Sequence, residues 1–136
     1  MLFRSRFDPL KDLPPIIDIA DGRLAMFSGN GQPWRDFNGM VAAAKASPGK
    51  YNHGSSTFLI QVLMEAIVRD RNLSVTSVQY RDSGELLNAV VGNHIEMTML
   101  SLPSVLPVTD KVHTLAVTGD TRYPGLRDVQ IGRAHV

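Results

Sequence analysis

The sequence predicts an α/β domain with a mainly parallel open sheet and helices on both faces. Short apolar and β-branched segments alternate along the chain with segments whose apolar residues recur at helical spacing. Gly, Pro and Ser separate these segments, which indicates short connections. Strands that alternate with helices through short connections are typical of a parallel sheet. The chain has 136 residues, which is the size of one domain.

Six strands are expected from the short apolar or β-branched runs that turn residues bound on both sides. They cover residues 16–20, 23–27, 51–53, 73–80, 95–100 and 112–118. A pair of alternating methionines, Met97 and Met99, is expected to face the same side of its strand and to fill gaps in the core. Trp34 is expected to be a packing anchor.

Four helices are expected between these strands. The first begins at Pro33, because the missing N–H of proline would have no partner in a first helical turn. The third covers residues 85–91 with Gly92 in the C′ position, and the fourth is a short helix over residues 103–107. Apolar residues at i, i+3, i+4 and i+7 mark the buried faces of the first two: Phe37, Met40, Val41 and Ala44, then Ile60, Leu63, Met64 and Ile67.

Composition and charge exclude several classes of protein. Hydrophobic residues make up 43% of the chain and charged residues 20%, which is typical of a globular protein. The net charge of +1 argues against nucleic acid or an anionic membrane as a partner. No apolar run approaches the ~20 residues of a membrane span, so no membrane insertion is expected. The chain has no cysteine, which excludes disulfides and thiolate metal sites.

Both ends of the chain read as foreign sequence. Residues 131–136 correspond codon by codon to ATC GGA AGA GCA CAC GTC, which resembles a translated short-read sequencing adapter. Residues 1–5 correspond to GTG CTC TTC CGA TCT, which resembles the reverse complement of the same adapter family. We therefore expect residues 1–5 and 131–136 to be adapter-derived and to flank a segment of a longer gene. The first ten residues show no signal peptide.

Three junctions between an expected strand and the following helix carry small hydroxyl residues. They cover residues 53–57, 80–84 and 100–104. In an open α/β sheet, ligands bind beyond the carboxyl ends of the strands, where the helix N-termini offer free N–H groups and roughly half a positive charge. This chemistry favours a small anion, most simply a carboxylate. Arg81 could pair with such a carboxylate, stay solvated or pair with Asp82. Ser56 and Ser83 could instead be plain N-caps, each stabilising its helix by about 1 kcal/mol.

Catalytic and metal-binding patterns are weak. The four histidines, His53, His94, His113 and His135, show no metal-ligand spacing. A Ser-His-Asp set could be assembled from Ser55, His113 and Asp110, but the serine has no G-x-S-x-G elbow. We therefore expect no catalytic residue, no metal and no cofactor. A small α/β hydrolase or transferase that uses one of the serine-bearing turns is the alternative function, and an effector-sensing domain of a regulator is a third.

Several stretches, read in order, resemble one family. They are residues 7–12, 42–56, 78–84, 102–107, 115–118 and 123–129. Their order and spacing are similar to those of the extracytoplasmic solute-binding receptors of tripartite tricarboxylate transporters, the TctC-like or Bug receptors. The resemblance extends over nearly all of residues 7–129.

The resemblance implies one lobe of a type II periplasmic-binding-protein fold, in which two domains close on a ligand like a Venus flytrap. Residues 6–22 would be the crossover from a missing first domain, and residues 23–130 most of the second ligand-binding domain. The implied function is capture of a small carboxylate or related metabolite in the periplasm, for uptake through membrane permease subunits. Such a receptor is a binding protein and not an enzyme.

The resemblance also implies the ligand-binding residues, because receptors of this family hold a carboxylate between helix N-termini and main-chain amides, partly through water. The residues at the matching positions are Gly54, Ser55, Ser56, Tyr80, Arg81, Ser83 and Gly84. From the hydroxyl residues of the junctions we add Thr57 and Ser101 to the expected ligand-binding residues. Asp82 replaces the usual glycine, and Leu100 stands where the family often has an acidic residue. The negative charge of Asp82 leaves an amino-bearing ligand, an amide ligand or a decayed site open.

Overall fold

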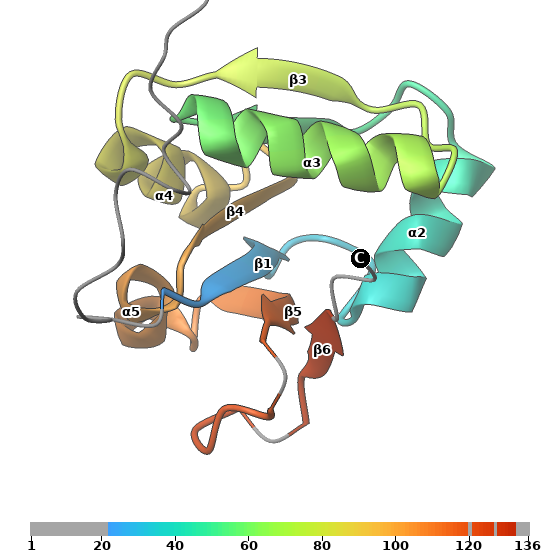
Figure 1. Ribbon diagram of the computed structural model, residues 1–136. Helices are drawn as coiled ribbons and strands as arrows, with labels where there is room; N and C mark the ends of the chain where they lie inside the picture. The colour runs from blue at the N-terminus through green and yellow to red at the C-terminus, as the bar shows by residue number, and fades with distance from the viewer. Residues whose placement is uncertain (1–21, 120, 127, 133–136) are drawn as a thin grey trace, which may run out of the picture.

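The computed structural model describes residues 22–119, 121–126 and 128–132, and its strands and helices alternate along the chain (Figure 1). The strands are β1 (Leu24–Gly29), β2 (Asn52–Ser55), β3 (Thr76–Gln79), β4 (Met97–Ser101), β5 (Val112–Thr118) and β6 (Gln130–Gly132). The helices are α2 (Phe37–Ala46), α3 (Phe58–Asp70), α4 (Ser83–Val91), α5 (Leu102–Val105) and the 3-10 helix η1 (Leu106–Val108). The strand expected over residues 16–20 and the chain ends 1–5 and 133–136 lie outside the described residues.

The six strands form one mixed sheet in the order β3-β2-β4-β1-β5-β6. Strand β2 is parallel to both β3 and β4, and β5 is parallel to β6. Strand β1 runs antiparallel to its neighbours β4 and β5, so it alone opposes the direction of the others. The expectation of a mainly parallel sheet is confirmed. The reversed central strand was not foreseen, because hydrophobic periodicity carries no information on strand direction.

Two hydrophobic clusters lie on opposite faces of the sheet, as expected for helices on both faces. Helices α2 and α3 cover one face with Phe37, Met40 and Met64, which pack on alternate strand residues such as Met26. Helices α4 and α5 cover the other face, where they pack on Phe27. Met97 and Met99 share the α2–α3 face, as predicted, and so does Trp34, which is 3% exposed. The alternation follows from the period of two along a strand.

Helix α2 begins later than expected, so the assignment of Pro33 to its first turn is wrong. The helix starts at Phe37, and the Asp36 side chain caps it by accepting a hydrogen bond from the Gly39 backbone N–H at 2.7 Å. Pro33 lies in the bend before the helix. The Asp36 carboxylate gives a first-turn N–H group a hydrogen-bond partner, which stabilises the start of a helix. Proline only lacks the N–H group and adds no hydrogen bond, so it stabilises the start less.

The end of α4 also differs from the expectation. Gly92 is the C-cap with a right-handed φ of −77°, and the next residue, Asn93, has the left-handed φ of 57°. Asn93 tolerates this backbone because its Oδ1 accepts a hydrogen bond from the Gly31 N–H at 3.0 Å. The tertiary contact with the β1–α2 loop therefore selects the asparagine, and Gly92 is not the C′ residue.

Other element bounds shift by a few residues, and the short helix expected over residues 103–107 is α5 followed by η1. Among the described residues, no helix has the length and apolarity needed to cross a bilayer.

Candidate ligand-binding rim

Three of the strand–helix turns meet at one edge of the sheet. Strands β2, β3 and β4 are parallel neighbours, so their carboxyl ends point the same way. Each is followed directly by a helix, and the first turn of α3 lies beside α4 (Figure 1). We call the set of turns at residues 56–57, 80–83 and 101–104 the rim. The three junctions singled out in the sequence are therefore brought together by the topology.

A direct contact joins the β2–α3 turn to the β3–α4 turn. The Oγ atoms of Ser56 and Ser83 lie 3.1 Å apart, within hydrogen-bonding distance, although 27 positions separate them. Ser83 is exposed and Ser56 half-buried. Both hydroxyls therefore lie at the surface where the two helices begin.

Neither serine is the N-cap of its helix, so the expectation that Ser56 and Ser83 are plain caps is wrong. Thr57 caps α3, accepting a hydrogen bond from the Ile60 N–H at 3.4 Å. Asp82 caps α4, its Oδ1 accepting from the Glu85 N–H at 2.8 Å. Because the neighbouring residues fill the capping positions, the two serine hydroxyls are left to contact each other.

Ser55 and Gly54 are buried beneath the rim. Ser55 joins β2 to β3, and Gly54 allows α4 to pack closely on β2. Ser55 is fully buried, and its hydroxyl donates to Gln79 Oε1 at 3.1 Å, which ties β2 to β3. The Tyr80 N–H donates to the Ser55 carbonyl at 2.8 Å and extends this pairing. A Cβ atom on Gly54 would collide with the Leu86 side chain and lie 3.2 Å from the Tyr80 ring. Glycine here allows α4 and Tyr80 to pack closely on β2.

The β3–α4 turn carries charges of both signs. Arg81, Asp82 and Gly84 are exposed, and Glu85 adds a second carboxylate in the first turn of α4. Within this described turn, the Asp82 carboxylate accepts a hydrogen bond from the backbone of α4 and forms no ion pair with Arg81. The N-terminus of α4 is thus already next to carboxylates of the chain itself.

The third turn carries a second serine pair. Ser101 Oγ lies 2.7 Å from Ser104 Oγ, and both residues are exposed. Leu100, which stands where the related receptors often have an acidic residue, is 4% exposed and packs in the cluster under α4 and α5. At this position the chain contributes a core residue and no charge to the rim.

Neither His53 nor His113 is placed to activate a serine of the rim. His53 is 1% exposed, and its Nδ1 atom has no hydrogen-bond partner. Burial lowers the pKa of His53 below its usual value near 6.5, and the nearby Glu65 carboxylate and a backbone hydrogen bond at Gly54 oppose that shift. His113 lies on β5, which β4 and β1 separate from β2 and Ser55. The Ser-His-Asp arrangement is therefore not formed.

Within the described part of the chain, no cluster of three His, Asp or Glu side chains could hold a metal ion.

The model of the tripartite tricarboxylate transporter family receptor, TctC, matches residues 2–134. The chain belongs to this receptor family. A protein of Cupriavidus necator, the UPF0065 protein in the gbd 5′ region, is 27% identical over 139 residues, which cover 95% of this chain and 42% of that protein.

Solved structures match with the same partial coverage. A structure described as a periplasmic transporter is 29% identical, with a TM-score of 0.81 over 92% of this receptor chain and 43% of its own. The R. palustris protein Rpa4515, solved with adipate, has a TM-score of 0.79 at 22% identity, over 96% of this chain and 45% of its own. The receptor chain therefore spans less than half the length of these relatives and matches one lobe of the fold.

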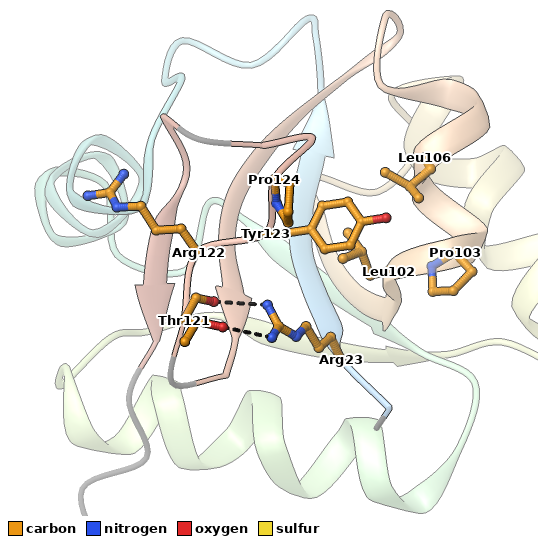
Figure 2. Close-up of a pocket in the computed structure, with 8 residues that line it drawn as sticks. All are labelled: Arg23, Leu102, Pro103, Leu106, Thr121, Arg122, Tyr123 and Pro124. Atoms are coloured by element: carbon orange, nitrogen blue, oxygen red, sulfur yellow. Dashed lines mark hydrogen bonds between the residues drawn. The ribbon is translucent and has the colours of Figure 1, made fainter. Parts of the chain in front are cut away.

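The receptor chain also has a cavity that sequence reasoning missed. Its volume is about 460 Å³, and it opens beside α5 at the same edge of the sheet as the rim (Figure 2). The lining residues are Arg23, Leu102, Pro103, Leu106, Thr121, Arg122, Tyr123 and Pro124. Residues 123–129 belong to a stretch that carried the family resemblance, but no local pattern connects them with Arg23, which is about a hundred positions away.

Proposed function

We propose that this chain is one lobe of a periplasmic receptor that binds a small carboxylate and delivers it to membrane permease subunits for uptake. The observation that carries the proposal is the contact between Ser56 and Ser83, which brings two hydroxyls and two helix N-termini to one point of the rim. In this proposal, the chain acts as a binding protein and not as an enzyme.

The rim offers the donors that a carboxylate needs. The first-turn amides of a helix have no intrahelical acceptor, and the positive end of the helix dipole favours an anion. Thr57 and Asp82 occupy the amides of Ile60 and Glu85. The amides at the very start of α3 and α4, together with the hydroxyls of Ser56 and Ser83, are the groups that we assign to the ligand.

The charges divide the rim into two parts. Asp82 and Glu85 place negative charge at the start of α4, whereas α3 has no acidic residue in its first turn. A ligand carboxylate therefore binds on the α3 side, near Ser56 and Thr57. An amino or amide group of the ligand would lie toward Asp82, where it could donate a hydrogen bond. Arg81 and Ser101 border these two positions.

The family supports the ligand class and the location. One related structure is described as a periplasmic transporter, and the related R. palustris structure contains adipate, a dicarboxylate. The chain spans 42–45% of the relatives described above, so the other lobe would supply the rest of the ligand contacts. We therefore expect the isolated chain to bind short dicarboxylates no more tightly than about 1 mM, which is roughly −4 kcal/mol.

Calorimetry with succinate and malate tests the division of the site between two lobes. Micromolar binding by this chain alone would contradict that division.

Amide NMR spectra recorded up to 20 mM succinate locate the residues that contact the weakly bound ligand, and we expect shifts at Ser56, Thr57 and Ser83. The variant Ser83→Ala should weaken these shifts, whereas Ser74→Ala, an exposed serine between α3 and β3, should not change them. Succinate-induced shifts that avoid the rim would refute the proposed function.

A further inference from the structure

Helix α3 has an apolar patch on its outer side. Phe58 is 80% exposed, Leu59 60% and Val62 45%, and they are the exposed large hydrophobic residues in the described part of the chain. Ile60 and Met64 are buried on the inner side of the helix. Phe58 and Val62 are one helical turn apart, and each is two positions from Ile60, so they lie on the side away from the sheet. We call Phe58, Leu59 and Val62 the α3 patch.

The apolar residues on this side of α3 are confined to the end next to the rim. Phe58 directly follows Thr57, the capping residue that belongs to the rim. Farther along the helix, the exposed residues are mainly charged and include Glu65, Arg69 and Asp70. A surface helix normally carries polar residues along the whole of its solvent side. The change from apolar to charged residues therefore indicates a partner that contacts only the rim end of α3.

No described element of the chain covers the α3 patch. Helix α3 packs on β2 and β4. In Figure 1 it lies in front of the sheet, and no described helix or strand lies over its outer side. A cluster of exposed apolar side chains is typical of a surface that another protein contacts. The patch therefore needs a partner that the described residues do not supply.

The size of the α3 patch distinguishes a separate partner from a tethered one. A stable complex of separate proteins buries about 800 Å² on each partner, and three partly covered side chains offer much less. A second copy of the chain would therefore associate only weakly through this patch. A partner on the same polypeptide needs less contact area, because its tether keeps it at an effective concentration on the order of 1 mM.

We propose that the other lobe of the receptor packs on the α3 patch through an apolar surface of its own, whether or not a ligand is bound. The inference rests on the proposed function in one respect, that this chain is one lobe. The chain covers 42–45% of the relatives described above, and the proposed site puts the second lobe at the rim, next to Phe58. The patch is on the outer side of α3, so this contact joins the lobes without touching the ligand.

Hydroxyl-radical footprinting tests the proposal on two proteins, the 136-residue chain and the full-length receptor expressed from the extended gene, both without ligand. We expect the oxidation rates of Phe58, Leu59 and Val62 to be several-fold lower in the full-length receptor. Leu73, which is half-buried beyond the other end of α3, should be oxidised at the same rate in both proteins. Equal rates at the α3 patch in the two proteins would overturn the proposal.

One substitution made in both proteins separates a role in the interface from a role in folding. Phe58→Ser should leave the unfolding midpoint of the isolated chain unchanged, because the ring is 80% exposed. In the full-length receptor it should lower the midpoint and raise the oxidation rates of Leu59 and Val62. Arg69→Ser, at an exposed position on the same side of α3, is the matched control and should change neither protein. A full-length receptor that Phe58→Ser leaves unchanged would refute the contact, and if that variant fails to fold, the footprint of the unmodified receptor decides.

Sedimentation of the isolated chain tests the competing occupant, a second copy. We expect a monomer at micromolar concentration. A dimer that Phe58→Ser dissociates would assign the α3 patch to a second copy and would overturn the proposal. Succinate shifts at the rim, measured on the chain alone, report on the proposed function separately. Those shifts can occur while the patch stays unprotected in the full-length receptor, and the reverse can also occur, so either proposal can fail while the other stands.

Discussion

Ser56 and Ser83 lie 3.1 Å apart, Oγ to Oγ, at the start of two different helices. The contact requires that β2 and β3 are adjacent and parallel and that Thr57 and Asp82 take over the capping. The order and direction of the strands therefore bring the residues of the rim together, and the residues beside the serines determine its charge. This arrangement leads to the following predictions.

Asp82 combines a capping role with an unfavourable charge for an anionic ligand, and two substitutions separate these effects. Asp82→Ala removes the acceptor of the Glu85 N–H and should lower the free energy of unfolding by about 1 kcal/mol. Asp82→Asn keeps an acceptor, so the stability should change little while succinate shifts at the rim become larger. Urea denaturation and NMR titration measure the two effects. Weaker succinate binding by Asp82→Asn would contradict the electrostatic argument.

The burial of His53 makes stability depend on pH. Its pKa is lowered in the folded state by desolvation, so the unfolded chain binds the proton more readily. The contribution of His53 to stability is therefore complete above the unfolded pKa of about 6.5 and is lost as the pH falls from there through the folded pKa. Urea denaturation between pH 7.5 and 5 should show this decline, and His53→Gln should reduce it. His94→Gln, at an exposed position, is the control.

Gly54 should tolerate no side chain. A methyl group there would meet Leu86 and the Tyr80 ring, so Gly54→Ala should destabilise the fold by about 1–3 kcal/mol through overpacking. Gly22→Ala is the matched control, because nothing lies within 4 Å of a Cβ atom at that position. Chemical denaturation of the two variants gives the comparison, and equal stabilities would show that β2 and α4 can move apart without cost.

Asn93 has two roles that substitution can distinguish. Asn93→Gly keeps access to the φ of 57° but removes the bond from Gly31, whereas Asn93→Ala loses both. Alanine should therefore be the less stable variant, by about 1–2 kcal/mol relative to glycine, because the left-handed conformation is strained for a residue with a Cβ atom. Thermal unfolding of the two proteins measures the difference. Similar midpoints would indicate that the turn adopts another conformation in the alanine variant.

Local patterns in the sequence determined the kind and order of the described helices and strands from β1 to β5, whereas β6 was not expected. Ile60 and Met64 form the buried face of α3, as their spacing indicates, because a helix of 3.6 residues per turn places them on one side. The turns that join β2, β3 and β4 to their helices were also predictable, since Gly, Ser and Pro interrupt the periodic segments there. The family resemblance, which the family model confirms, depended on the same ordered stretches.

Only the tertiary structure decided how the strands and helices are arranged relative to one another. Ser55 is buried and Ser56 is half-buried, although the two residues are adjacent in sequence. Because β2 lies between β3 and β4, Ser55 forms a hydrogen bond to Gln79, whereas Ser56 is part of the rim. The reversed direction of β1 brings Arg23 to the carboxyl edge of β4, where it meets Thr121 across 98 positions. Periodicity describes which face of an element is apolar. Strand direction, register and neighbours result from packing the whole chain, so the cavity beside α5 could be recognised only in three dimensions.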